Sequence, residues 1–328
     1  MIISRTPFRL SFFGGGTDYP IWYRRHGGTV LGCAIDKYCY LTCRPLPPFF
    51  EHSIRVVYSK IENRRTIEEI EHPAVRECLR YLRVAEGVEI HHDGDLPARG
   101  GIGSSSAFTV GLLNALHALQ GRTLVKSELA RQAIHLEQDV LVESVGSQDQ
   151  VLTCYGGMNR VLFQPDGRID VQPITLEKEA AGRFNDHLLL FYTGVQRVAS
   201  EVAGTYIHQL PEKQRELREI AAMVEVGLEH LRQENYRAFG ALMDEYWQLK
   251  KSLGALVSDP QTDSLYECAR KAGAWGGKLV GAGGGGYFLA FAPPEAQSQI
   301  REALGLLEIP FGFDNTGSQI IFSDHQAE

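Results

Sequence analysis

Residues 95–108, DLPARGGIGSSSAF, place several glycines and three consecutive serines at the start of a helical pattern. Ordering glycine costs backbone entropy, so packing alone is a poor reason for such a run. Bare backbone lets a ligand approach the amide groups, the helix N-terminus adds partial positive charge, and serine hydroxyls add donors or metal ligands. This combination favours binding of a polyphosphate. The alternative is a serine-capped buried helix with a flexible lead-in.

The common phosphate-loop signatures do not fit this segment. No Gly-Lys-Ser/Thr ends it, which excludes a Walker A loop, and the preceding HHDGDLP is too polar and proline-broken for a dinucleotide fingerprint. A second run, GAGGGGYF at residues 281–288, matches GxGxxG but leads into a strand and not into a helix. It suits close approach of backbone to a ligand or to another loop, with a plain flexible hairpin as the alternative.

A third glycine run, FFGGGTDYP at residues 12–20, follows a predicted strand and precedes Asp18. A carboxylate there can accept hydrogen bonds from two sugar hydroxyls, and an ordinary turn or cap aspartate is the alternative. Three such runs in one chain are hard to explain by packing, so we expect a ligand site that they share.

The composition excludes several classes of protein. The chain has 328 residues, 44% of them hydrophobic, and a formal net charge of −7, which argues against a general nucleic-acid or anionic-membrane surface. No apolar run approaches a membrane span, and the N-terminus reads as a strand and not as a signal peptide. The six cysteines include no CxxC pair, which predicts reduced thiols in a cytoplasmic protein.

Hydrophobic periodicity predicts an α+β protein and not a doubly wound one, because strands dominate early and helices alternate with strands later. Strands are expected at residues 6–13, 29–35, 38–43, 54–59, 88–92, 187–193, 278–281, 287–292, 311–313 and 319–322, with a hairpin turning at 165–167. Helices are expected at 73–83, 107–120, 126–143, 263–272 and 294–304, and with breaks over 197–251. A domain boundary is expected near 165–187, which gives domains 1–175 and 176–328.

The three glycine runs resemble the three motifs of the GHMP kinases, in the family's order and spacing. PFRLSFFGGGTDYP resembles the first motif, LPARGGIGSSSA the second and KLVGAGGGGYFLAF the third. The resemblance implies two domains, an N-terminal one like ribosomal S5 domain 2 and a ferredoxin-like C-terminal one, with the active site between them. It also implies ATP and Mg²⁺. Within the family, the likeness is greatest to sugar 1-kinases that act on D-glycero-D-manno-heptose 7-phosphate, in nucleotide-activated heptose synthesis for surface polysaccharide.

The resemblance also assigns roles to individual residues. It implies that Asp149, in GSQDQ, is the catalytic base and that Arg9 lies near the reacting hydroxyl. Ser105 and Glu137 would hold the metal ion. The phosphates would be bound by Gly100, Gly101, Gly103, Ser104, Ser105 and Ser106. The acceptor would be bound by Gly15, Gly16, Thr17, Asp18, Gly283, Gly284 and Arg197, with Arg24, Arg25 and Arg160 as further candidates for its distal phosphate by side-chain type alone.

One departure from the family pattern concerns the acceptor. Galactokinases carry Glu-His before Thr-Asp-Tyr, whereas this chain has Gly15 and Gly16, so we expect open space there and discrimination against galactose. The rival acceptors are fucose or another monosaccharide. A non-catalytic sugar- or nucleotide-binding regulator is the rival class, although neither Asp149 nor Glu137 is missing. The expected partners are a sugar phosphate and a nucleotide, not nucleic acid or membrane, and a homodimer is left open.

Overall fold

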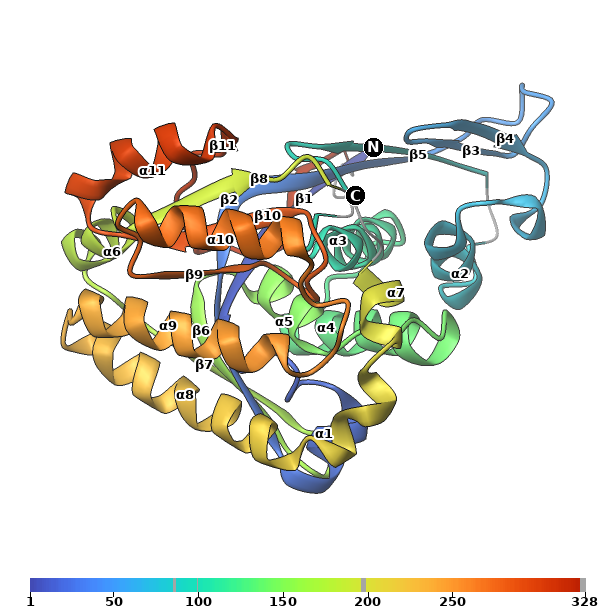
Figure 1. Cartoon of the computed structure of the whole chain (residues 1–328). Coiled ribbons are helices and arrows are strands. Elements are labelled where there is room, and N and C mark those ends of the chain that lie inside the picture. The colour runs from blue at the N-terminus through green and yellow to red at the C-terminus, as the bar shows by residue number, and fades with distance from the viewer. Residues whose placement is uncertain (85–86, 99, 196–198, 325–328) are drawn as a thin grey trace.

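The computed structural model describes residues 1–84, 87–98, 100–195 and 199–324, and it contains two sheets with helices packed around them (Figure 1). In these residues the first sheet has eight strands, ordered β12-β1-β2-β5-β3-β4, with β6 paired to β2 and β7 to β6. Its strands are β1 (Ile2–Phe13), β2 (Gly28–Pro45), β3 (Ile54–Val57), β4 (Ile61–Arg64), β5 (Val88–Gly94), β6 (Met158–Phe163), β7 (Ile169–Pro173) and β12 (Gln319–Ser323). All pairs are antiparallel except β3 with β5.

The second sheet is antiparallel, in the order β11-β8-β10-β9. Its strands are β8 (Leu188–Tyr192), β9 (Gly276–Leu279), β10 (Tyr287–Phe291) and β11 (Leu307–Glu308). Helices lie between the strands of both sheets along the chain, so the α+β prediction is confirmed. The last strand, β12, returns to pair with β1, so residues 319–323 belong to the first sheet although they lie beyond the predicted boundary at 175/176.

Helices from the first half cover the first sheet. They are α1 (Pro20–His26), η1 (Ile67–Glu69), α2 (Pro73–Tyr81), α3 (Ser104–Leu119), α4 (Lys126–His135), η2 (Leu136–Val140) and α5 (Gln148–Tyr155). The sequence of α3 is apolar nearly all round, and the helix is correspondingly buried between the sheet and its neighbouring helices. Figure 1 shows α3, α4 and α5 grouped on one side of β1 and β2.

Helices from the second half pack on the smaller sheet and, in part, on elements of the first half. They are α6 (Lys178–Asn185), α7 (Ala199–Gly204), η3 (Ile207–Glu212), α8 (Gln214–Arg232), α9 (Tyr236–Lys251), α10 (Pro260–Lys271), η4 (Pro294–Ala296) and α11 (Gln297–Leu304). Of these, α8 and η3 pack against β1, β2 and α1 of the first half. Figure 1 shows α8 and α9 running side by side beneath the sheet, while α10 and α11 lie above them. No helix in the described part of the chain is both long enough and apolar enough to cross a membrane.

The end of β1 lies between the two halves. The ring of Phe12 packs edge to face on Phe184, with centroids 5.5 Å apart, and Phe13 packs on Phe239 at 5.1 Å. The buried ammonium of Lys278 donates to the carbonyl oxygens of Ser11 and Phe12, at 2.7 and 3.2 Å. The residues that follow β1, which include Gly15 and Asp18, are therefore held where elements of both halves meet.

Candidate active site

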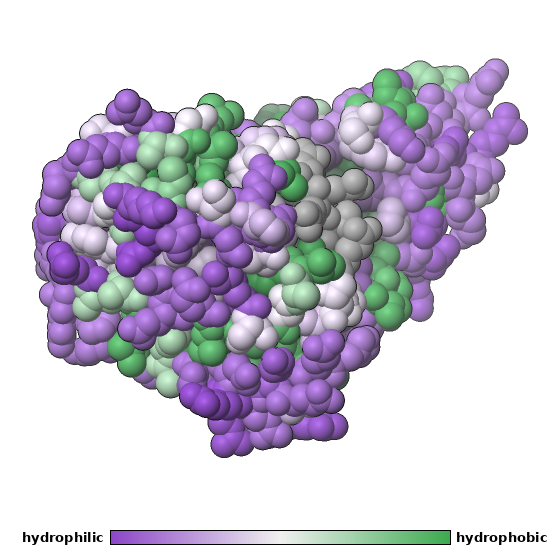
Figure 2. Space-filling view, in the orientation of Figure 1, coloured by the Kyte–Doolittle hydropathy of each residue, from purple (hydrophilic) through white to green (hydrophobic). Residues whose placement is uncertain are grey.

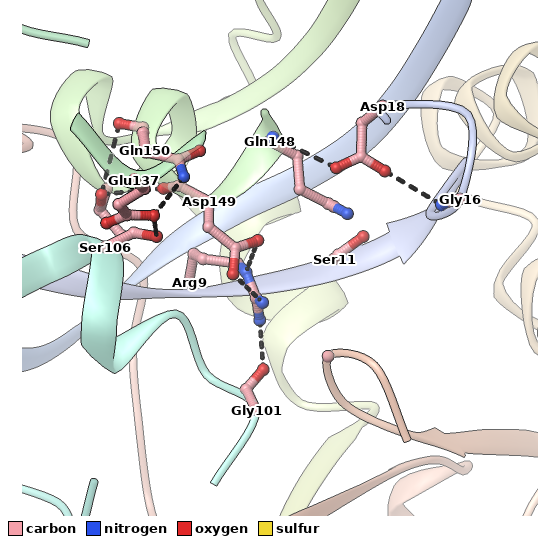
Figure 3. Close-up of polar contacts among 12 residues, drawn as sticks. Arg9, Ser11, Gly16, Asp18, Gly101, Ser106, Glu137, Gln148, Asp149 and Gln150 are labelled. Carbon is pink, nitrogen blue, oxygen red and sulfur yellow. Dashed lines mark hydrogen bonds and ion pairs between the residues drawn. The ribbon is translucent and has the colours of Figure 1, made fainter. Parts of the chain in front are cut away.

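Arg9 and Asp149 form an ion pair at the centre of the candidate site (Figure 3). Arg9 lies on β1 and is 3% exposed, whereas Asp149 lies in the first turn of α5 and is 26% exposed. The guanidinium donates from Nε to Asp149 Oδ1 at 2.8 Å and from Nη2 to Oδ2 at 2.6 Å. Its Nη1 donates to the carbonyl oxygen of Gly101 at 2.5 Å. One buried side chain thus links the accessible carboxylate to the glycine loop.

Residues 100–106 lead into the N-terminus of α3, as the sequence predicts. Gly103 precedes the helix in the left-handed conformation, with φ 74°, and α3 begins at Ser104. The first amides of a helix have no intrahelical acceptor and carry partial positive charge, so this turn can bind an anion. Ile102 is tied to the first sheet, because its carbonyl oxygen accepts the Arg9 amide at 3.0 Å. The contacts of this loop with phosphate stay a prediction.

The glycine run that begins at residue 100 packs directly on the run at residues 281–288. A Cβ at Gly101 would lie 2.3 Å from the Val280 carbonyl oxygen, and one at Gly281 would lie 2.5 Å from the Gly101 carbonyl oxygen. At Gly100 a Cβ would lie 2.2 Å from the ring of Tyr287. Side chains are therefore sterically excluded at these positions, which explains part of the glycine content without a ligand.

Gly283 and Gly284 face a loop of the second half. The Gly284 amide donates to the Val257 carbonyl oxygen at 3.0 Å, and a Cβ at Gly283 would lie 2.4 Å from the same oxygen. These contacts hold the loop, and the predicted role of both glycines in acceptor binding stays a prediction. A cavity of about 370 Å³ lies beside Gly284, between α10 and α11, and neither Arg9 nor Asp149 lines it.

Asp18 is buried and held by backbone amides close to Asp149. Its Oδ1 accepts the Gly16 amide at 3.0 Å and its Oδ2 accepts the Gln148 amide at 3.3 Å (Figure 3). Burial, and then the negative charge of Asp149, raise the pKa of Asp18. The hydroxyl of Thr17, another predicted acceptor ligand, donates to the carbonyl oxygens of Gly14 and Thr29, at 2.8 and 2.9 Å. In this arrangement Thr17 shapes the turn that presents Asp18.

The expectation of open space at Gly15 and Gly16 is wrong. A Cβ at Gly15 would lie 3.0 Å from the hydroxyl oxygen of Tyr246 on α9. A Cβ at Gly16 would lie 3.2 Å from Leu217 on α8 and 3.5 Å from Leu253. Side chains from the second half lie against both glycines, so the surroundings of the first motif are shaped by helices that the motif does not include.

Glu137 is fully buried in the π-helical turn η2, a local irregularity that is frequent at functional sites. Its Oε2 accepts the Ser106 hydroxyl at 2.8 Å and the side-chain amide of Gln150. Its Oε1 makes no well-formed hydrogen bond in the described residues, although the Thr109 hydroxyl lies near the carboxylate and acts to lower its pKa. Burial, and then the charge of Glu143, raise the pKa of Glu137 to about 8.

These observations fit a magnesium ion at Glu137. A buried carboxylate with one oxygen that lacks a well-formed hydrogen bond is stabilised by a cation, and carboxylate and hydroxyl oxygens are ligands that Mg²⁺ accepts together with phosphate oxygens. The structure brings Ser106 to Glu137, whereas the predicted ligand Ser105 is exposed in the first turn of α3. The role of Ser105 stays a prediction, and Ser106 is the serine that the geometry adds.

Two buried lysines near this site were not predicted. Lys250 on α9 is 5% exposed and donates to the carbonyl oxygen of Gly281. Burial, and then repulsion from Arg9, lower the pKa of Lys250 to about 8, opposed by attraction to Asp18 and Asp149. Burial, and then repulsion from Lys250, lower the pKa of Lys278 well below its ordinary value. Nothing in the sequence marks either residue, because a lysine on a helix or strand is usually solvated.

The predicted arginine ligands of a distal phosphate are not gathered in the described residues. Arg24 and Arg25 are exposed at the end of α1. Arg160 on β6 forms an ion pair with Glu225 of α8. Arg197 lies outside the described residues, so its role stays a prediction.

Comparisons with known proteins agree with the motif order. The GHMP kinases N terminal domain matches residues 68–157, and the GHMP kinases C terminal domain matches residues 228–306. A mevalonate kinase from Methanothermobacter thermautotrophicus is 30% identical over 217 residues, which cover 66% of this chain and 68% of that protein. A D-glycero-alpha-D-manno-heptose 7-phosphate kinase from Campylobacter jejuni is 26% identical over 92% of this chain and 93% of that protein.

The fold agrees with solved structures. A D-glycero-D-manno-heptose 1-phosphate kinase from Bacteroides thetaiotaomicron superposes with a TM-score of 0.81 at 21% identity, over 98% of this chain and all of that one. Both domain matches, the relatives along nearly the whole chain and the two-domain α/β fold lead to one assignment: the chain belongs to the GHMP kinase family.

Proposed function

We propose that this GHMP kinase transfers the γ-phosphoryl group of ATP to the anomeric hydroxyl of D-glycero-D-manno-heptose 7-phosphate, giving the 1,7-bisphosphate. The observation that carries the proposal is the bridge made by Arg9. Its guanidinium holds Asp149 with two hydrogen bonds and the glycine loop with a third. A carboxylate that can orient an alcohol is thereby fixed beside a loop that can bind phosphates.

Phosphoryl transfer depends mainly on positioning and charge neutralisation. Asp149 would orient the acceptor hydroxyl and take its proton late, while Arg9 would stabilise the oxygen as it loses that proton. The amides at the start of α3 would take negative charge from the transferring group. Mg²⁺, held by Glu137 with Ser106 or Ser105, would neutralise phosphate charge when bound.

The relatives support a sugar acceptor and leave its identity to experiment. The Campylobacter jejuni relative is named for heptose 7-phosphate and matches nearly end to end, which favours that acceptor over fucose or another monosaccharide. Figure 2 shows hydrophilic residues over much of the visible face, with hydrophobic residues gathered in smaller patches between them.

The test is a coupled ADP-release assay over heptose 7-phosphate, the unphosphorylated heptose, L-fucose and D-galactose, with the product phosphate located by phosphorus NMR. We expect the highest kcat/KM for heptose 7-phosphate, poor turnover of galactose and phosphate on C1. Efficient galactose turnover, or phosphate on another carbon, would overturn the proposed acceptor. Absence of ADP release with every sugar would overturn the proposed function.

A further inference from the structure

Three polar side chains from separate elements converge beside Gly15. A Cβ built on Gly15 would lie 3.0 Å from Tyr246 Oη, 3.6 Å from Gln148 Nε2 and 4.0 Å from Ser11 Oγ. These are the three nearest heavy atoms to that point apart from Gly15 and its chain neighbours, and none of them is carbon. Ser11 lies on β1, Gln148 begins α5 and Tyr246 lies on α9. We call Ser11, Gln148 and Tyr246 the Gly15 cluster.

The Gly15 cluster is not satisfied within the protein. Ser11 Oγ and Gln148 Oε1 have no hydrogen-bond partner in the described residues, and the Tyr246 hydroxyl has no acceptor for its proton there, although the Gly15 amide reaches its oxygen. Ser11 is 4% exposed and Tyr246 is fully buried. Burial raises the pKa of Tyr246 far above its ordinary value, so the phenol keeps its proton and needs an acceptor. Folded proteins rarely leave buried polar groups unpaired, so unpaired atoms on three neighbouring side chains indicate a missing ligand.

The Gly15 cluster lies next to the reacting groups. Gln148 precedes Asp149 in the chain, and the backbone amide of Gln148 donates to the Asp18 carboxylate. Figure 3 shows the side chains of Ser11 and Gln148 extending toward one another, with the Arg9–Asp149 pair close by. A ligand that hydrogen-bonded to these side chains would therefore be in reach of both aspartates.

The chemistry of the Gly15 cluster selects for hydroxyl groups. A serine hydroxyl donates and accepts, an amide side chain offers both an acceptor oxygen and donors, and a phenol donates. This neutral, mixed set matches the hydroxyls of a sugar ring, each of which also donates and accepts. A phosphate would instead call for cations or several amide donors. The three atoms nearest the point are uncharged, and the Lys278 ammonium, 4.5 Å from the Tyr246 ring, already donates to the carbonyl oxygens of Ser11 and Phe12.

We infer that the Gly15 cluster binds ring hydroxyls of the acceptor sugar and sets which sugar is accepted, while any phosphate on the acceptor is bound elsewhere. This inference rests on the proposed function, because it needs a sugar acceptor. It assigns specificity to Ser11, Gln148 and Tyr246.

Ser11→Ala and Tyr246→Phe test the inference, with Ser4→Ala as the matched control. Ser4 lies on the same strand, is equally buried, and donates its hydroxyl to the Gly111 carbonyl oxygen at 2.9 Å. Tyr246→Phe keeps the ring that packs on Phe13 and lies 4.5 Å from the Lys278 ammonium. Removing an unpaired hydroxyl should leave the melting temperature of the free enzyme unchanged or raise it, whereas Ser4→Ala should lower it.

Kinetics provide the second readout. Each cluster variant should raise the KM for the acceptor by about 3- to 10-fold, the range for one neutral hydrogen bond, with the KM for ATP unchanged. Ser4→Ala should leave both KM values as in the wild type. The factor should be the same for the heptose with and without its 7-phosphate, because the lost contact is to a hydroxyl.

The outcomes separate the inference from the proposed function. Wild-type acceptor KM values in both cluster variants, measured with any sugar that the wild-type enzyme phosphorylates, overturn the inference alone. A loss confined to the 7-phosphorylated heptose also overturns it, since the cluster would then bind phosphate. Wild-type turnover of another sugar but not of heptose 7-phosphate overturns only the proposed acceptor, and the same variants are then measured with that sugar. If the wild-type enzyme phosphorylates no sugar, both are overturned.

Discussion

At the scale of single residues, replacing the Asp149 carboxylate should slow phosphoryl transfer without weakening ATP binding. Asp149→Asn keeps one acceptor oxygen for Arg9 but loses the charge that orients and deprotonates the acceptor. Turnover should fall by roughly 10²- to 10⁴-fold with ATP affinity nearly unchanged. Steady-state kinetics measure the turnover, and nucleotide titration measures the ATP affinity. Glu234→Gln is the control, because Glu234 makes a similar forked pair with Arg183, at 2.7 Å for both bonds, on the exposed surface. Equal turnover in Asp149→Asn and the wild type would refute its role.

Glu137→Gln should raise the Mg²⁺ concentration needed for half-maximal rate, because a neutral amide oxygen replaces a charged ligand. Ser106→Ala should do the same more weakly, since Ser106 Oγ is the hydroxyl bonded to Glu137. The measurement is a magnesium titration of the rate at saturating ATP. Ser105→Ala is measured in parallel to decide which serine binds the metal ion. A larger increase in the required Mg²⁺ concentration for Ser105→Ala than for Ser106→Ala would favour Ser105, as the family resemblance implies. Unchanged magnesium dependence in Glu137→Gln would place the metal elsewhere.

Lys250 allows a prediction about pH. Its pKa is lowered to about 8 in the folded protein, from an ordinary value of 10.5, so between these pH values the unfolded chain holds a proton that the folded chain has lost. Folding stability therefore rises with pH in this window, by up to ~1.4 kcal/mol per unit. Urea unfolding at pH 7.5 and 9.5 should show the wild type gaining stability relative to Lys250→Met. An equal stability difference between the two proteins at both pH values would contradict the lowered pKa of Lys250.

The residues of the site were only partly predictable from sequence. Arg9 and Asp149 are 140 positions apart, and their contact could be expected only through the family resemblance. The glycines of the first motif suggested open space, yet Tyr246 lies against Gly15. Tyr246 and Lys250 are one helical turn apart on α9, a spacing that also fits an ordinary buried face. Their approach to the site depends on how the two halves pack, which no local pattern encodes.

At the scale of elements, the sequence predicted long periodic segments well and short ones poorly. The strand at residues 287–292 and the helix at 107–120 are confirmed, with shifts of a few residues at their ends. The predicted strands at 29–35 and 38–43 form the single strand β2, which continues because its first half pairs with β6 and its second with β5. The elements α1, α6, β4 and β11 are too short for a periodic signal, and residues 311–313 form only one bridge, from Phe313 to Ile35.

The docked glycine loops can be tested with single alanines. Gly101→Ala places a methyl group 2.3 Å from the Val280 carbonyl oxygen in a residue with φ +82°, so clash and backbone strain should lower stability by ~2 kcal/mol or more and weaken nucleotide binding. Gly182→Ala, inside α6 with open space around it, should instead stabilise by about 0.5–1 kcal/mol. Urea unfolding and nucleotide titration measure both effects. A Gly101→Ala protein of wild-type stability would show that the loops are not docked in solution.

At the scale of the whole molecule, β1 connects the two halves. Its first residues pair with β12 from the C-terminal end of the chain, and Thr6 and Ser318 share a hydrogen bond of 2.8 Å between their hydroxyls. Its last residues are held by aromatic side chains of the second half and by Lys278. A strand that is buried in both halves cannot leave one without disturbing the other, so the halves should unfold together.

Deleting residues 319–328 tests this coupling, because it removes β12 and leaves β1 with an open edge. We expect the unfolding free energy to fall by a few kcal/mol, at about 1 kcal/mol for each lost hydrogen bond. Two single-tryptophan proteins report on the halves, one keeping Trp22 on α1 and the other Trp247 on α9, both of which are buried. Their fluorescence should shift to the same lower urea midpoint, although β12 pairs with β1 and packs on α3, both of the first half. Deletion of residues 325–328 alone, which leaves β12 whole, should leave both midpoints unchanged. A shift of the Trp22 signal with an unmoved Trp247 signal would show that the halves unfold independently and that β1 does not couple them.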